Sequence, residues 1–311
     1  MADERVRATV RDDDPLALWP KDKPLPVRLV DYEAVVGAGA IVSSLGNWGY
    51  FEGALLTCGL QRSQEEGLRI EGSAVMIAPG LAITATHVFE EYWDDLASGQ
   101  ERMALQGIRS DGSMDVWRVE HITISRADDM ALLSVALMSA IHPDWYISTF
   151  PLTTRTPTEG ELITIVGFRE AKEERVIELC EVSSQTSVGD VYVAQGTVGT
   201  VYPDGRDAVA LPYPAFEVLC GSLGSMSGGA VLEASGKLVG IISRGWMTDA
   251  MDGPTYATVI NELLTRPIRL DWPPGVYDAR PMLYEIDPAL VHIEGREKLI
   301  WKDGHLAYKV W

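Results

Sequence analysis

The sequence predicts an all-β fold, and three observations support this prediction. Aromatic and β-branched residues that favour strands are frequent, with 11 Tyr and 9 Trp in the 311-residue chain. The 29 Gly and 17 Pro interrupt the apolar segments at short intervals, which is typical of many short strands rather than long helices. A hydrophobic fraction of 46% is enough to form the core of one large or two ordinary domains.

The charge and the terminal sequence exclude several classes of partner. The net charge of −19, from 26 basic and 45 acidic residues, would repel a phosphate backbone, so we expect no nucleic-acid partner. Apolar runs stay shorter than the roughly 20 residues that span a bilayer, and the N-terminus lacks a signal-peptide pattern. We therefore expect a cytoplasmic protein that does not bind membranes. Three scattered cysteines without a Cys-x-x-Cys pair predict no disulfide framework, no metal and no cofactor.

The first strands lead to a histidine. Residues 1–34 are polar and rich in proline, so they cannot form a core and are predicted to be an N-terminal extension. The folded body is expected to start at residue 35, with short apolar runs at 35–43 and 53–58. A strand over 68–78, a turn at 79–80 and a strand over 81–86 follow, and the second strand ends on His87. A short helix over 88–96, terminated by Gly99, is predicted next.

The middle of the chain continues the strand pattern. The acidic turn 125–129 places Asp129 directly before an apolar strand over 130–137. The other predicted strands have the short spacing typical of barrels, and they cover residues 114–124, 162–168, 175–182, 191–198 and 255–259. A helix over 258–265 is predicted to end before Pro267.

The last 45 residues differ from the body. Residues 267–311 are predicted to form a C-terminal extension that ends in a hairpin over 298–311, with the turn at Asp303-Gly304. Trp301, Tyr308 and Trp311 of this hairpin need a surface on which to pack. The hairpin either covers the folded body or binds a partner.

Residues 222–232 contain the strongest functional signal. Small residues between 224 and 229 predict a tight turn, and apolar strands over 230–232 and 237–243 follow it. Such a corner presents the hydroxyl of Ser227 next to backbone N–H groups, which acyl transfer requires to stabilise an oxyanion. The same composition also fits a loop without chemistry.

A histidine and an aspartate at two strand ends complete the residue types of a nucleophilic site. A neutral imidazole at His87 can accept the proton of the Ser227 hydroxyl when the oxygen attacks a carbonyl carbon. A carboxylate at Asp129 can hold the imidazole tautomer and stabilise the imidazolium.

Three short blocks resemble the signatures of the trypsin-like (chymotrypsin-fold) serine peptidases, of the bacterial intracellular type. They are Thr-Ala-Thr-His at 84–87, Asp-Met-Ala-Leu-Leu at 129–133 and Gly-Ser-Met-Ser-Gly-Gly at 224–229, in the chain order of that family. The three candidate residues are separated by 42 and 98 residues. The resemblance covers about residues 35–265 and implies two antiparallel six-stranded β-barrels, divided near residue 145, with a short C-terminal helix.

The resemblance also implies a role for each site residue. Ser227 would be the nucleophile, His87 the general base and then acid, and Asp129 its orienting carboxylate. Asp128 is the competitor for the acid, and Ser222 and Ser225 are competitors for the nucleophile. The oxyanion hole would consist of the backbone N–H groups of Ser225 and Ser227.

The resemblance places the substrate pocket at Gly221, Ser243, Arg244 and Gly245. Gly221 stands where trypsin carries an acid, so cleavage after Lys or Arg is not expected. Arg244 either pairs with an acidic side chain of the substrate or points to solvent.

Two departures from the family pattern affect residues 224–229, which the resemblance implies to be the nucleophile loop. Ser225 stands where the family usually has glycine, which allows an oxyanion hole that is unformed at rest. Met226 replaces the acid that captures a newly cut N-terminus in animal enzymes of the family, so zymogen activation of that kind is not expected.

The sequence therefore predicts a serine endopeptidase that hydrolyses protein or peptide substrates through an acyl-enzyme. Regulation by a protein partner or by a stress or defence signal is expected for such an enzyme. The alternative is a catalytically silent protease fold that binds proteins, with the C-terminal hairpin as its contact. An esterase of the same fold is a further alternative.

Overall fold

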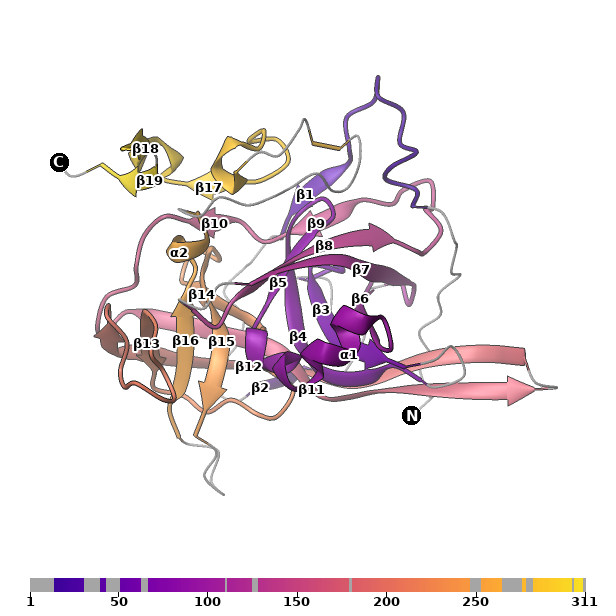
Figure 1. Ribbon diagram of the computed structural model, residues 1–311, viewed down its shortest axis with the longest axis horizontal. Coiled ribbons are helices and arrows are strands. Elements are labelled where there is room, and N and C mark those ends of the chain that lie inside the picture. Colours follow the sequence, from indigo (N-terminus) through magenta and orange to yellow (C-terminus); the bar gives the residue numbers. More distant parts are fainter. Residues whose placement is uncertain are drawn as a thin grey trace.

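Most of the described chain is β-strand, and twelve of its strands close into two six-stranded antiparallel barrels (Figure 1). The computed structural model describes residues 14–30, 40–42, 51–62, 67–109, 111–124, 128–178, 181–246, 253–264, 276–277, 282–303 and 305–309. The predicted fold class, all-β with two barrels and a short C-terminal helix, is confirmed.

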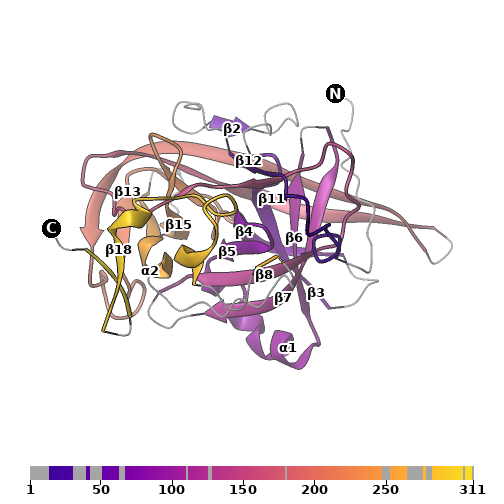
Figure 2. The same ribbon diagram turned by 90° about the horizontal axis from the view of Figure 1, so that it is seen from above.

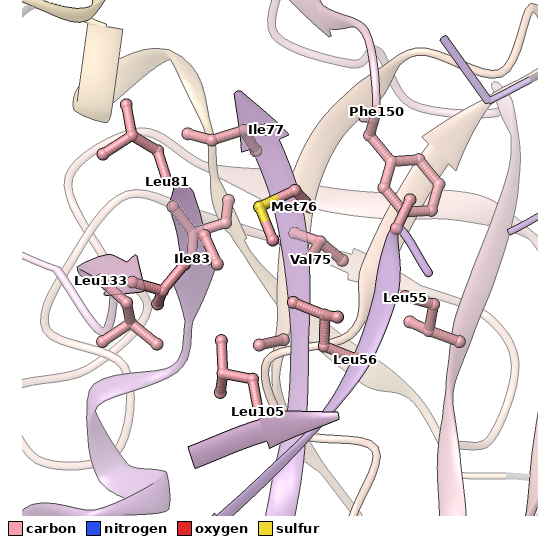
Figure 3. Packing of buried hydrophobic residues seen from close by; sticks show 14 of the residues in the cluster. Leu55, Leu56, Val75, Met76, Ile77, Leu81, Ile83, Leu105, Leu133 and Phe150 are labelled. Atoms are coloured by element: carbon pink, nitrogen blue, oxygen red, sulfur yellow. The ribbon is translucent and has the colours of Figure 1, made fainter. Parts of the chain in front are cut away.

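The first barrel has the strand order β3-β4-β5-β8-β7-β6. Its strands contribute aliphatic and aromatic side chains to one buried cluster, among them Leu56, Met76, Ile83 and Leu133 (Figure 3). Strand β8 is buried along its whole length, which explains its uninterrupted apolar sequence. The strands are β3 (Leu55–Gln61), β4 (Arg69–Ala78), β5 (Leu81–Thr84), β6 (Arg102–Ile108), β7 (Met114–Ile124) and β8 (Ala131–Leu137).

The second barrel has the order β14-β11-β12-β13-β16-β15 and closes through the pairing of β14 with β15. Its core is a separate cluster that includes Ile165, Phe216, Met226 and Val231. Met226 comes from the nucleophile loop, so that loop is anchored in this core. The strands are β11 (Leu162–Glu178), β12 (Glu181–Tyr202), β13 (Ala215–Val218), β14 (Ala230–Glu233), β15 (Leu238–Gly245) and β16 (Thr255–Val259).

Two predicted element boundaries are wrong. The three strands expected at 162–168, 175–182 and 191–198 are instead two long strands, β11 and β12, which pair with each other and project from the body (Figure 1). The change from apolar to charged residues at 169–175 suggested an interruption, but backbone pairing between the strands continues there. The helix expected over 88–96 is confined to α1 (Trp93–Ser98), which ends at Gly99 in a left-handed conformation (φ 75°).

Short elements from both ends of the chain join the body. Strand β1 (Val27–Leu29) pairs in parallel with β9 (Ile147–Thr149), and Leu16 is buried in the first barrel's cluster. Strand β17 (Ile293–Glu294) pairs with β10 (Leu152–Thr153), which also pairs with β15. The remaining elements are β2 (Ala40–Val42), η2 (Thr86–Val88), η3 (Glu90–Tyr92), α2 (Asn261–Leu264), η4 (Leu283–Glu285) and η5 (Arg296–Lys298).

The predicted C-terminal hairpin is present as β18 (Leu299–Lys302) and β19 (His305–Tyr308). It lies at the opposite end of the molecule from the projecting arm of β11 and β12 (Figures 1 and 2). The Tyr308 hydroxyl donates to the carbonyl of Asn261 at 3.3 Å, but Trp301 is 52% exposed, against the expectation that it packs on a surface. Trp311 lies outside the described residues. No helix in the described ranges is long and apolar enough to cross a membrane.

Candidate active site

The pairing of two strands in the first barrel brings His87 to Asp129. Strand β5 pairs with β8 so that Thr84 lies opposite Ala131, and the turn η2 continues β5 and carries His87. The backbone N–H of Thr86 donates to the carbonyl of Asp129 at 3.3 Å. Antiparallel pairing therefore makes neighbours of two residues that are 42 positions apart.

The carboxylate of Asp129 is buried, with 6% of the residue exposed, and accepts three hydrogen bonds. The backbone N–H of His87 donates to Oδ1 at 3.0 Å, and Nδ1 of the same residue lies 2.6 Å from Oδ2. The hydroxyl of Ser243 donates to Oδ2, also at 2.6 Å. Because the carboxylate fixes both the backbone and the ring of His87, the opposite ring nitrogen is held toward the second barrel.

The second ring nitrogen of His87, Nε2, contacts the hydroxyl of Ser227. Nε2 of His87 lies 2.9 Å from the Ser227 Oγ, and the carbonyl of Ser227 accepts a 2.8 Å hydrogen bond from the Ser73 N–H in strand β4. On the other side, the N–H of Gly228 donates to the carbonyl of Ile242 at 2.7 Å. The structure thus brings the three predicted residues into one hydrogen-bonded row where the barrels meet.

The competing residues have other contacts. The carboxylate of Asp128 accepts a hydrogen bond from the N–H of Met130 at 3.2 Å, whereas the contacts to the His87 ring come from Asp129. Ser222 is buried, and a Cβ added to Gly245 would overlap its hydroxyl. The contacts of the described residues therefore pair His87 with Ser227 rather than with Ser222 or Ser225.

The backbone N–H groups of Ser225 and Ser227 are the candidate donors to an oxyanion. Within the described part of the chain, neither group donates a hydrogen bond to protein. Ser225 has φ of 68°, a left-handed conformation that a residue with a Cβ rarely adopts. The loop thus accommodates the Ser225 side chain, and the N–H groups of Ser225 and Ser227 keep no protein acceptor among the described residues. Such backbone donors are what an oxyanion requires.

A cavity of about 320 Å³ lies beside this row and is lined by His87 and Ser227. Ser243, Arg244 and Gly245 of the predicted pocket also line it. The Ser243 side chain turns away to Asp129, so this residue does not contact substrate through its hydroxyl. Gly221 is buried and is not among the lining residues.

A larger cavity of about 660 Å³ lies between α1 and strands β6 and β7. Its lining includes His121 but neither a serine nor a cysteine, so size does not make it the better candidate site. In the described residues, no group of three His, Cys, Asp or Glu side chains is arranged to hold a metal ion.

Comparison with known proteins agrees with this geometry. The family description of the trypsin-like peptidase domain matches residues 72–241, more than half of the chain and all three site residues. The chain belongs to the trypsin-like peptidase family. No curated protein sequence matches the chain significantly.

Solved structures with similarity to this trypsin-like peptidase include Deg5 and Rv3671c. Deg5 is 15% identical, with a TM-score of 0.46 over 68% of this chain and 85% of that chain. Rv3671c from M. tuberculosis H37Rv, solved as an inactive serine-to-alanine mutant, is 13% identical, with a TM-score of 0.43 over 73% of this chain and 93% of that chain.

Ser73 is a site residue that sequence reasoning missed. Its hydroxyl donates to the carbonyl of Ser225 at 2.8 Å and accepts from the N–H of Phe168 at 2.8 Å. Together with its N–H bond to Ser227, these contacts tie a strand of the first barrel to the nucleophile loop and to β11. The available signal was a polar residue, fully buried in the structure, at the start of the apolar run 73–78.

We expect Ser73→Ala in this trypsin-like peptidase to lower the free energy of unfolding by about 1 to 3 kcal/mol, because the buried N–H of Phe168 and the half-buried carbonyl of Ser225 lose their partner. A fall in kcat of about 10-fold should accompany it, since Ser225 is no longer fixed. Urea unfolding and steady-state kinetics measure both effects. Thr57→Val is the matched control, because the buried Thr57 hydroxyl has no hydrogen-bond partner among the described residues. Equal effects of the two substitutions would contradict the assigned role.

Tyr213 is linked to the Asp129 carboxylate through the hydroxyl of Ser243. Its hydroxyl lies 2.8 Å from the Ser243 Oγ, and because Ser243 donates its own proton to Asp129, Tyr213 donates to Ser243. Burial, followed by the nearby charge of Asp129, raises the pKa of Tyr213 to about 12. The phenol therefore stays protonated and remains a donor at neutral pH.

We expect Tyr213→Phe to reduce kcat by roughly 2- to 10-fold with little change in KM, since one donor of the network is lost. A double-mutant cycle with Ser243→Ala checks the connection. If Tyr213 acts through Ser243, the double variant is no worse than Ser243→Ala alone. Additive losses in kcat would contradict this connection.

Proposed function

We propose that this trypsin-like peptidase is a serine endopeptidase that uses Ser227, His87 and Asp129. The observation that carries the proposal is the continuous row of contacts, 2.6 Å from Asp129 to His87 and 2.9 Å from His87 to Ser227. Both distances lie within the range over which a nucleophile and its base exchange a proton. The three residues also follow the chain order His, Asp, Ser of the family signature.

Acylation starts at the Ser227 hydroxyl. The Oγ attacks the carbonyl carbon of the peptide, and Nε2 of His87 takes the hydroxyl proton. Asp129 stabilises the resulting imidazolium and keeps Nδ1 as a donor. The negative charge on the tetrahedral oxygen would accept hydrogen bonds from the N–H groups of Ser225 and Ser227, which have no other acceptor within the described residues.

The two products then leave in separate steps. His87 returns the proton to the amine nitrogen as the peptide bond breaks, which leaves the acyl group on Ser227. Water attacks the acyl carbon while His87 takes a proton from it. His87 then returns this proton to the Ser227 Oγ as the bond from Oγ to the acyl carbon breaks, which releases the acid product and restores the hydroxyl.

The edge of strand β15 supports a peptide as the substrate. Strand β14 pairs with β15 only as far as Ile241, whereas β16 continues to pair with it at Arg244 and Gly245. The opposite edge of these last residues is open to the cavity beside Ser227. An extended peptide can add to such an edge through main-chain hydrogen bonds.

A fluorophosphonate probe tests the proposal directly. We expect the full chain to be labelled on Ser227, as located by peptide mapping, and Ser227→Ala and His87→Ala to lose the label. Ser235→Ala, on the exposed turn between β14 and β15, serves as the matched serine control and should label like the wild type. A folded chain that never labels would instead favour the silent protein-binding fold, and labelling without hydrolysis of any peptide would favour an esterase.

A further inference from the structure

Two arginines border the cavity at the candidate nucleophile. Arg206 lies in the loop between β12 and β13, and Arg244 lies near the end of β15. Both side chains are exposed, and both line the cavity of about 320 Å³ that also contains His87 and Ser227. Two cations at one small cavity are unusual for a chain whose net charge is −19.

Neither guanidinium forms an ion pair with a carboxylate in the described part of the chain. The acid nearest in sequence, Asp207, uses its Oδ1 to accept the N–H groups of Val209 and Ala210. These backbone donors, Ala210 first, lower the pKa of Asp207, and the nearby charge of Arg206 lowers it by a smaller amount. Other arginines of the chain do have carboxylate partners, namely Arg62, Arg69, Arg109, Arg118 and Arg155.

Aromatic rings hold one of the two guanidinium groups in place. The Arg206 guanidinium carbon lies 4.9 Å from the ring centroid of Tyr256 and 5.9 Å from that of Trp246. The Tyr256 hydroxyl donates to Glu217 at 3.2 Å, which fixes its ring. A guanidinium that stacks on rings keeps the N–H groups in its plane, and these can bind a carboxylate.

Arg244 stands between this cavity and an adjoining one of about 560 Å³, because it lines both. The adjoining cavity also contains Glu90 and Tyr213. Contact with Arg244 is one of the minor influences that lower the pKa of Tyr213, against the larger effect of burial. Arg244 is therefore near the hydrogen-bonded row at one end and the substrate edge of β15 at the other.

We propose that Arg206 and Arg244 form a subsite that selects substrates with an Asp or Glu side chain within a few residues of the scissile bond. This inference rests on the proposed peptidase function. A peptide that extends along β15 from Ser227 passes the cavity that both arginines border, so its side chains reach them. The overall negative charge of the protein repels acidic peptides at long range, so the selection comes from these local contacts. Trp246, which is 57% exposed and lines the same cavity, would cover the aliphatic part of the bound side chain.

Paired peptides that differ only by Glu against Gln, with the exchange placed at each position around the cut, test the proposal. We expect the wild type to prefer Glu at one position by about 10-fold in kcat/KM, as a charge-assisted hydrogen bond implies. The preference should fall with added salt and disappear in the double variant Arg206→Gln, Arg244→Gln. Arg244→Glu should reverse it toward Lys. Arg62→Gln, which removes a paired arginine outside the cavity, should keep it.

The outcomes separate failure of the subsite from failure of the enzyme. If the variants and the wild type label equally with the fluorophosphonate probe but show no Glu preference, the subsite is wrong and the peptidase stands. If nothing labels, calorimetric titration of Ser227→Ala with the Glu and Gln peptides still tests the subsite. Equal affinity for the two peptides would then overturn it.

Discussion

Asp129→Asn is expected to reduce kcat by roughly 10⁴-fold with a much smaller change in KM. The Asp129 carboxylate acts only as an acceptor, for the N–H and Nδ1 of His87 and for the hydroxyl of Ser243. An asparagine has one acceptor oxygen, and its NH₂ group would face one of these donors. The arrangement then favours the imidazole tautomer that carries its proton on Nε2, which cannot accept the proton of Ser227.

Hydrolysis of a peptide substrate under saturating conditions measures this loss. Asp128→Asn is the matched control, because it removes the adjacent carboxylate charge and keeps an oxygen for the N–H of Met130. We expect the control to change kcat by less than about tenfold, since Asp128 is not the carboxylate that meets the His87 ring. Equal losses of kcat in both variants would show that kcat depends on the negative charge of this segment and not on the hydrogen bond between Asp129 and Nδ1.

Gly228→Ala is expected to destabilise the protein by about 3 kcal/mol or more and to abolish activity. Gly228 has φ of 83°, where a Cβ is strained. An added Cβ would also overlap the carbonyl oxygen of Ser73 and the hydroxyl of Thr84. The second of these donates to the first at 2.7 Å, so neither is free to move aside. The nucleophile loop would have to leave its position between the barrels.

Gly224→Ala provides the matched comparison in the same loop. Its Cβ would meet nothing within 4 Å, and its φ lies outside the left-handed region. We expect this variant to unfold within about 0.5 kcal/mol of the wild type. Chemical denaturation followed by tryptophan fluorescence compares the two. A Gly228→Ala protein as stable as Gly224→Ala would show that the loop adapts, against the packing described here.

His87, Asp129 and Ser227 could be named from the sequence because each lies in a short local pattern and the three patterns together resemble one family signature in chain order. A strand end, a strand start and a turn of small residues can be recognised within a few residues of sequence. The structure joins the first two patterns by pairing Thr84 with Ala131 in neighbouring strands.

The supporting residues could not be predicted, because their roles depend on contacts between distant segments. Ser73 reaches Ser225 across 152 positions, and Tyr213 reaches Ser243 across 30. No local periodicity encodes such pairs. The projecting parts of β11 and β12 escaped prediction for a related reason, since their charged residues resemble a loop until the partner strand is known.

The contacts of Ser73 also determine how the activity should be lost on heating or in denaturant. One side chain connects strand β4, strand β11 and the turn that carries Ser227, so a small slide between the barrels breaks all of these contacts together. Hydrolysis should therefore fail before circular dichroism records any loss of strands. Peptide hydrolysis would then measure the docking of the two barrels rather than the integrity of either one.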